Sequence, residues 1–123
     1  MIDEQAEARA LASVQEKLNY TFADSRLLRL ALVHRSHTHN RGGSHLETNE
    51  RLEFLGDAVL SLVMSEALFK RHRDEPEGIL TTRRAAIVST RGLARIARRL
   101  GIGDALVLGQ GAENSGERAR SSV

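Results

Sequence analysis

Apolar residues recur at spacings of three and four along most of this chain, which is the period of an amphipathic helix. The first segment with this pattern, residues 4–18, is predicted to form a helix that ends at Asn19 and Tyr20. Asp24 is a favourable N-cap residue and predicts the start of a second helix. The apolar stripe of that second helix consists of Leu27, Leu28, Ala31 and Leu32. Both helices are therefore expected to bury one face.

The longest predicted helix lies in the middle of the chain. Residues 37–48 are polar and contain two adjacent glycines, so they are predicted to form a surface loop. A cap at Thr48 or Asn49 then begins a helix that runs from Asn49 to about Arg71. At 1.5 Å per residue this helix would be roughly 34 Å long, which makes it the expected backbone of the fold.

Two shorter helices are predicted after it. Residues 73–78 contain the only proline, Pro76, and interrupt the helical pattern. The two helices are expected to be divided near Ser89-Thr90 and to end at Gly101, and residues 109–122 are predicted to form a loop or a frayed end. Aromatic and β-branched residues never alternate over a strand-length run. The predicted fold class is therefore all-α.

The composition is that of one soluble globular domain. The chain has 123 residues, of which 41% are hydrophobic and 28% charged. It has no apolar run of the length of about eighteen residues that a membrane span needs, and its first residues lack the pattern of a secretory signal. The predicted location is therefore cytoplasmic. Because the chain has no cysteine, any metal must be held by oxygen or by imidazole.

The charges are unevenly distributed along the chain. The net charge is only +2, but residues 70–99 contain nine basic residues and three acidic ones. A local basic surface favours a partner that carries phosphate groups, such as a nucleic acid. The same charge distribution is also expected if these arginines are simply solvated on the outer faces of amphipathic helices. From charge alone, this second explanation is the simpler one.

Three carboxylates at the start of the long helix are predicted to share one face. At 100° per residue, Glu50, Glu53 and Asp57 lie within about 60° of arc. The opposite side carries an apolar stripe that is predicted to face the core, composed of Leu52, Leu55, Val59, Leu62 and Val63. A hard cation such as Mg²⁺ needs only one or two carboxylates and would neutralise these like charges, with Glu77 contributing from the next loop. Spacing alone favours the alternative that they complement the helix dipole and face solvent.

Phe54 lies beside these carboxylates and away from the aliphatic stripe, at about 40° on the same helical wheel. Its side chain is therefore expected to be partly exposed. A large apolar side chain in this position is either a contact for a partner or one of the single exposed hydrophobic residues that soluble proteins commonly have.

Residues 49–60, with the sequence NERLEFLGDAVL, closely resemble the signature of the ribonuclease III family. The segments 32–36, 77–80 and 108–113 match the same family in the same order, so the resemblance covers nearly the whole chain. It implies a helical endonuclease domain over residues 1–123 that pairs as a symmetric homodimer. The implied activity is metal-assisted hydrolysis of double-stranded RNA to 5′-phosphate and 3′-hydroxyl products in the processing of rRNA and mRNA.

The resemblance also implies roles for individual residues. Glu53 and Asp57 would hold Mg²⁺, with Mn²⁺ as a possible substitute, and Asp57 would be essential for catalysis, while Glu50 and Glu77 would line the cleavage site. Phe54 would be the dimer contact. Metal-assisted hydrolysis requires neither a nucleophilic side chain nor a small-molecule cofactor. The basic residues expected to hold RNA phosphates are Arg83, Arg84, Arg91 and Arg95.

The family pattern has a further part that these 123 residues do not contain. It includes an Asp and a Glu three residues apart on one more helix, which would follow Val123, and bacterial members usually have a double-stranded RNA-binding domain. The favoured interpretation is that the chain is a fragment of a longer enzyme. The alternative is a short relative that binds RNA or a partner, or pairs with itself, without cutting.

The histidines and one glycine-rich segment are not predicted to form a metal or phosphate site. The histidines at 34, 37, 39 and 45 are taken as structural or solvated rather than as zinc ligands, because no fourth ligand follows at the usual spacing. Gly109-Gln110-Gly111 is taken as a turn, because no phosphate-loop lysine accompanies it.

Overall fold

The computed structural model describes residues 3–39, 42–108, 113 and 116–119. Throughout these residues the regular structure is helical, and the only strand-like pairing in this part of the chain is an isolated parallel bridge between Val33 and Val107. The all-α prediction is therefore confirmed. The turn predicted at Gly109-Gln110-Gly111 and most of the predicted 109–122 loop lie outside the described residues.

The two N-terminal helices have the bounds that their capping residues predict. In α1 (Glu4–Leu18) the side chain of Asp3 accepts a hydrogen bond from the Gln5 backbone N–H at 3.0 Å, and the helix ends at Asn19, whose φ is 52°. In α2 (Ser25–Ala31) the Asp24 carboxylate accepts a hydrogen bond from the Arg26 backbone N–H, also at 3.0 Å. Each aspartate satisfies a backbone donor that the helix itself leaves free.

The predicted surface loop over residues 37–48 is wrong in part. The described residues of this region form one short helix, α3 (Ser36–His39), and a 3₁₀ turn, η1 (His45–Glu47). The turn is capped by Ser44, whose hydroxyl accepts a hydrogen bond from the Leu46 backbone N–H at 3.1 Å. Such turns of three or four residues are too short to produce an apolar period, so the sequence pattern does not reveal them.

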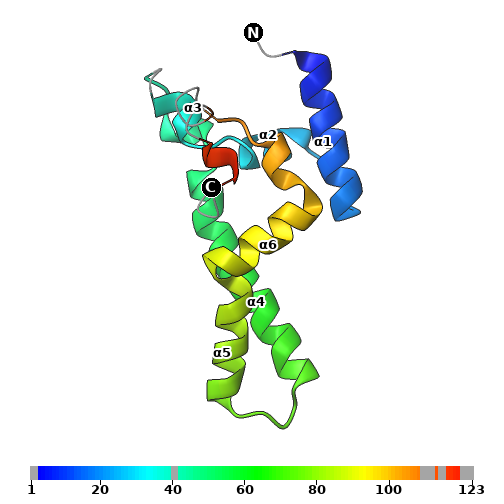
Figure 1. The fold of residues 1–123 in the computed structure, drawn as a ribbon, viewed down its shortest axis with the longest axis vertical. Coiled ribbons are helices and arrows are strands. Elements are labelled where there is room, and N and C mark those ends of the chain that lie inside the picture. Colours follow the sequence, from blue (N-terminus) through cyan, green and yellow to red (C-terminus); the bar gives the residue numbers. More distant parts are fainter. Residues whose placement is uncertain (1–2, 40–41, 109–112, 114–115, 120–123) are drawn as a thin grey trace.

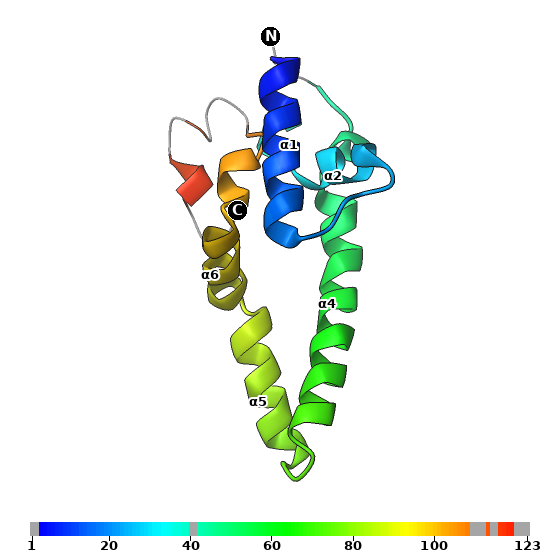
Figure 2. The ribbon, with the colours of Figure 1, turned by 90° about the vertical axis from the view of Figure 1, so that its right-hand side faces the viewer.

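The second half of the chain forms an open helical hairpin. The long helix α4 (Glu50–Arg71) is followed by α5 (Glu77–Val88), which runs back along it, and then by α6 (Thr90–Leu100), as the sequence predicts. Figure 2 shows α4 and α5 in contact near their connection and diverging toward α6. Gly101, with φ 66°, ends α6, and the short turns η2 (Ile102–Ala105) and η3 (Glu117–Ala119) follow.

The hydrophobic core lies at the end of the molecule away from the hairpin tip. Val14, Leu28 and Leu32 are buried together, and η2 packs against α1 beside them. Figure 1 shows α1, α2 and the segment after α6 gathered at this end. None of the helices in the described part of the chain is long and apolar enough to cross a membrane.

The predicted core-facing stripe of α4 is exposed except at Leu52, which is half-buried, and this corrects the sequence prediction. Leu62 is 69% exposed, and Leu55, Val59 and Val63 are also more than half exposed. The reason is that α5 packs on a different side of α4, where Leu68 is 8% exposed. Leu68 lies five helical turns after Glu50 and therefore points in the same direction. The carboxylates thus occupy the side of α4 that α5 covers further along, and the aliphatic stripe faces outward.

Candidate active site

The start of α4 is held in place by the segment between α2 and α3. The Asn49 backbone N–H donates to the Val33 carbonyl at 2.9 Å, and its side-chain amide donates to the Ala31 carbonyl at 3.0 Å. On the other edge of the same segment, the His34 N–H donates to the Val107 carbonyl at 2.9 Å. The first turn of α4 therefore has a defined position relative to two parts of the chain that are distant in sequence.

The sequence prediction of a cap at Thr48 or Asn49 is confirmed in position, since Asn49 is the N-cap and the helix begins at Glu50. The Asn49 side chain does not cap the helix, because its amide is used by Ala31. Instead the buried Thr48 hydroxyl lies 3.4 Å from the Glu50 backbone nitrogen. Thr48 thus caps α4, and Asn49 attaches the start of α4 to the end of α2.

The three carboxylates of the first α4 turns, Glu50, Glu53 and Asp57, are all exposed. The only polar side-chain contact seen for them within the described part of the chain is from the Thr48 hydroxyl to Glu50 Oε1, at 3.4 Å. None of the ion pairs among the described residues involves these three carboxylates, although the chain has 18 lysines and arginines. Within the described residues, no ion pair therefore neutralises their negative charge.

A cavity of about 590 Å³ opens beside two of these carboxylates. His34, Arg35, Asn49, Glu50 and Glu53 line one side of it. The other side consists of Leu106 and of α6 residues, namely Thr90, Leu93, Ala94 and Ala97. Asp57 is not among the lining residues and lies about one turn further along the same face of α4. The cavity therefore occupies the space between the start of α4 and α6.

Within one chain, Glu77 does not lie near the other predicted acidic site residues, Glu50, Glu53 and Asp57. It is the first residue of α5, at the hairpin tip, whereas Glu50 is the first residue of α4 (Figure 2). From Asp57 to the end of α4 at Arg71 the helix already rises about 21 Å. Among the described residues, no group of three or more His, Asp or Glu side chains is close enough to form a metal site.

The donor chemistry nevertheless fits a hard divalent cation. Carboxylate oxygens on a rigid helix are the ligands that Mg²⁺ prefers, and Mg²⁺ usually takes one or two carboxylates and completes its coordination with water. Glu53 and Asp57 are one helical turn apart on one face, so both can contribute oxygens to the same region. A site of this kind would be open to solvent and to a phosphate group.

Phe54 is 85% exposed, so its predicted exposure is confirmed. Beside it lies a hollow of about 810 Å³. The hollow is lined by Leu30, His45, Leu46, Thr48, Glu50, Arg51, Leu52, Phe54 and Leu55. An aromatic ring and an apolar hollow therefore lie next to each other on the surface, one turn from the carboxylates.

Two of the four predicted RNA-binding arginines already have partners within the chain. The Arg83 guanidinium donates two hydrogen bonds of 2.6 Å to Glu75 and thereby holds the pKa of that carboxyl below its usual value. The Arg84 guanidinium donates to the Ser65 hydroxyl at 2.8 Å and so joins α5 to α4. Arg91 and Arg95 are exposed on α6, and no ion pair within the described residues includes them.

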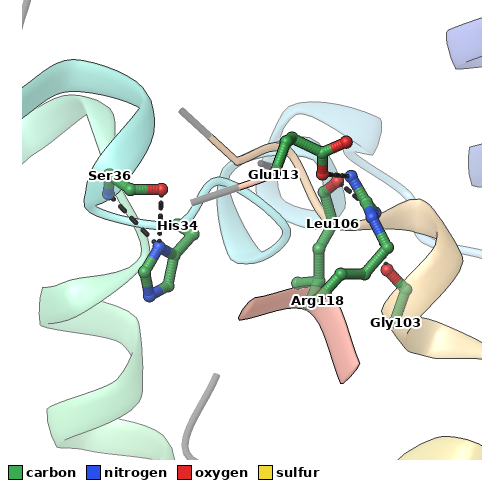
Figure 3. Close-up of polar contacts among 6 residues, drawn as sticks. All are labelled: His34, Ser36, Gly103, Leu106, Glu113 and Arg118. Atoms are coloured by element: carbon green, nitrogen blue, oxygen red, sulfur yellow. Dashed lines mark hydrogen bonds and ion pairs between the residues drawn. The ribbon is translucent and has the colours of Figure 1, made fainter. Parts of the chain in front are cut away.

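The contacts of Arg118 could not be predicted from the sequence. Its guanidinium donates to the carbonyls of Gly103 and Leu106, both at 2.7 Å, and forms an ion pair with Glu113 (Figure 3). These contacts attach the short η3 turn to the segment that contains Leu106, one of the cavity-lining residues. No periodic or motif signal marks Arg118, because two of its three partners are backbone carbonyls that any residue could supply.

Comparison with known proteins matches residues 24–123 to the family model described as Ribonuclease-III-like. Ribonuclease 3 of Oleidesulfovibrio alaskensis is 52% identical over 110 residues, which are 89% of this chain and 48% of that protein. Ribonuclease 3 of Streptomyces coelicolor is 45% identical over 121 residues, which are 98% of this chain and 42% of that protein. The chain thus spans about half the length of the curated relatives it matches.

Two solved structures of the nuclease domain of ribonuclease III from Campylobacter jejuni have the same fold. Each is 40% identical to this chain in sequence and superposes with a TM-score of 0.80. The first covers 89% of this chain and 73% of its own, and it concerns structural flexibility in the region involved in dimer formation of that domain. The second covers 90% of this chain and 71% of its own.

Proposed function

The chain belongs to the ribonuclease III family, and from this premise we propose that it cleaves double-stranded RNA as a divalent-metal-dependent endonuclease. The observation that carries the proposal is the set of exposed carboxylates at the start of α4, none of which has an ion-pair partner within the described residues. Glu66 and Glu75, by contrast, have a lysine and an arginine beside them. Carboxylates left without a cation on a rigid helix are suited to bind one.

In this proposal Glu53 and Asp57 hold Mg²⁺, or Mn²⁺ in its place, and Glu50 lines the same cleft. When bound there, the cation would supply Lewis acidity at the phosphate and would lower the pKa of a water molecule. The water oxygen forms a bond to phosphorus while the bond from phosphorus to the 3′ oxygen breaks. One water proton ends on the leaving oxygen, so the products carry a 5′-phosphate and a 3′-hydroxyl. This would serve RNA processing in the cytoplasm.

The proposed active form is a symmetric pair of chains with Phe54 as the contact. A C₂ pair presents the same surface twice, so an exposed ring beside an apolar hollow is suited to it. Within one chain Glu77 lies at the far end of the hairpin from Asp57, so a catalytic role for Glu77 requires a second chain to bring it to the site.

The RNA phosphates are proposed to contact the basic surface of α5 and α6. Arg91 and Arg95 are expected to contribute more than Arg83 and Arg84, whose guanidinium groups already have intramolecular partners. Replacing Arg91 or Arg95 by Ala should weaken binding similarly for all sequences and reduce the salt slope of log K by about one each, measured by filter binding at rising salt. An unchanged slope in both variants would place the RNA elsewhere.

The experiment that tests the function is cleavage of end-labelled double-stranded RNA by this chain in Mg²⁺, in Mn²⁺ and in excess EDTA. Asp57→Asn and Glu53→Gln should each lower the rate by more than about 100-fold, because removing a direct ligand costs more than removing a residue that only orients one. Glu66→Gln is the matched control, since Glu66 is an exposed acid of the same helix whose partner is Lys70. It should cut like the unchanged chain.

The alternative is a non-cutting module that binds RNA or pairs with itself. Retention of RNA without cleavage in either metal would support that alternative and would contradict the proposed activity of this chain. Equal cleavage by Asp57→Asn and by the Glu66→Gln control would show that the nuclease centre does not lie on the α4 carboxylate face.

A further inference from the structure

His34 has a side-chain orientation that its neighbours define. It lies in the short segment between α2 and α3 and is half-buried. Its Nδ1 lies 3.2 Å from the Ser36 backbone nitrogen and 2.8 Å from the Ser36 hydroxyl (Figure 3). A backbone N–H can only donate, so Nδ1 accepts, and the neutral imidazole carries its hydrogen on Nε2. His34 is therefore a hydrogen-bond donor at its other nitrogen.

This donor lies at the cavity beside the α4 carboxylates. His34 lines the cavity of about 590 Å³ together with Glu50 and Glu53. Figure 3 shows Nε2 on the edge of the ring away from Ser36. Among the described residues no hydrogen bond to Nε2 is present, so its donor capacity is available within this part of the chain.

The two carboxylates of the cavity differ in their existing contacts. Glu50 receives a hydrogen bond from the Thr48 hydroxyl and also lines the hollow beside Phe54. Glu53 lines the cavity that it shares with His34, and no side-chain hydrogen bond holds its carboxylate within the described part of the chain. A glutamate side chain without such a contact has several rotamers, which weakens it as a ligand.

We propose that His34 is a positioning residue that donates its Nε2 hydrogen to the Glu53 carboxylate and so orients that carboxylate toward a divalent cation. The inference rests on the proposed metal-dependent function and adds a residue to it. Carboxylates that ligate metals are themselves commonly hydrogen-bonded, and loss of such a partner typically weakens metal binding by about 10- to 100-fold. The Ser36 contact gives this donor its direction before any cation arrives.

The test is Mn²⁺ binding to the whole chain without RNA, followed by the electron paramagnetic resonance signal of free Mn²⁺. His34→Phe keeps a planar ring but removes the donor, and it should weaken Mn²⁺ binding by about 10- to 100-fold. His34→Gln replaces the donor by an amide N–H and should restore much of the affinity. His37→Phe is the matched control, because His37 lines a different cavity, and it should bind like the unchanged chain.

Each other outcome is decisive. Unchanged Mn²⁺ binding in His34→Phe, with binding lost in Glu53→Gln, would overturn the role of His34 and leave the proposed metal centre intact. An equal loss in His34→Gln and His34→Phe would assign His34 a purely structural role. If His34→Phe does not fold, as judged by circular dichroism, the His34→Gln variant decides. Absence of Mn²⁺ binding in the unchanged chain would overturn both the metal centre and this inference.

Discussion

At the scale of single residues, two sets of acidic side chains in this protein differ in their partners. Glu7, Asp24, Glu66 and Glu75 each lie within ion-pair distance of a basic side chain. Glu50, Glu53 and Asp57 have no such pair within the described residues. The first group has a cationic partner within the fold, whereas the second leaves negative charge on one face of α4, where we propose that a cation binds.

Glu75 carries a pH-dependent prediction. The hydrogen bonds from Arg83, and more weakly the neighbouring charges of Arg83 and His72, hold its pKa below the ordinary value. A carboxyl whose pKa is lowered by folding stabilises the fold above its ordinary pKa and loses that contribution as the pH falls through the lowered value. Glu75→Gln should therefore lower the Tm more at pH 7 than at about pH 3, because the contribution declines once the pH is below the ordinary carboxyl pKa. A Tm difference that is equal at both pH values would contradict this.

At the scale of elements, the connection between α5 and α6 sets the position of the α6 wall of the cavity. Ser89 ends α5 and caps α6, where its hydroxyl accepts a hydrogen bond from the Gly92 backbone N–H at 3.0 Å. A Cβ on Gly92 would lie 2.4 Å from the carbonyl oxygens of both Ala86 and Ile87. The angle between the two helices, and hence the position of the α6 wall of the cavity, therefore depends on glycine at this residue.

Gly92→Ala should destabilise the protein by about 1–3 kcal/mol, because the added methyl group forces the two helices apart. Gly78→Ala is the matched control, since a Cβ on this α5 glycine meets nothing within 4 Å. The control should be neutral or slightly stabilising, by about 0.5–1 kcal/mol. Urea denaturation followed by circular dichroism measures both. A Gly92→Ala variant as stable as the Gly78→Ala variant would show that the connection can relax.

At the scale of the whole molecule, the core and the open hairpin occupy opposite ends. The core gathers α1, α2 and η2, whereas α4 extends beyond it (Figure 1). Four residues of its aliphatic stripe are more than half exposed, namely Leu55, Val59, Leu62 and Val63. Exposed apolar area of this extent is typical of surfaces that contact other chains. Phe54, which lies beside the carboxylates and away from the stripe, is more exposed than any residue of the stripe.

Phe54→Ala should weaken self-association by about 30-fold or more in Kd, because aromatic anchors at an interface typically contribute at least about 2 kcal/mol. Phe69→Ala is the matched control, as this exposed ring lies fifteen residues, or about 22 Å, further along α4. Sedimentation equilibrium measures both constants. Equal association of the Phe54→Ala variant and the unchanged chain would remove Phe54 from the interface.

Much of the secondary structure could be predicted because its signals are local. Asp3, Asp24, Pro76 and Gly101 act within one helical turn of themselves, and each marks a helix boundary in the structure. The short turns at α3 and η1 could not be predicted, because they are shorter than the apolar period. The attachments made by Asn49 and Arg118 also escaped, since their acceptors are backbone carbonyls without a residue-specific signal.

The sequence by itself determined which residues share a face of each helix, because helical periodicity depends only on spacing. It placed Glu50, Glu53 and Asp57 on one face of α4, with Phe54 beside them. Only the tertiary structure decided which face of α4 meets a neighbour, since that depends on where α5 and α6 pack. Glu50 and Glu53 therefore face the cavity beside His34, and the stripe that contains Leu62 is left exposed.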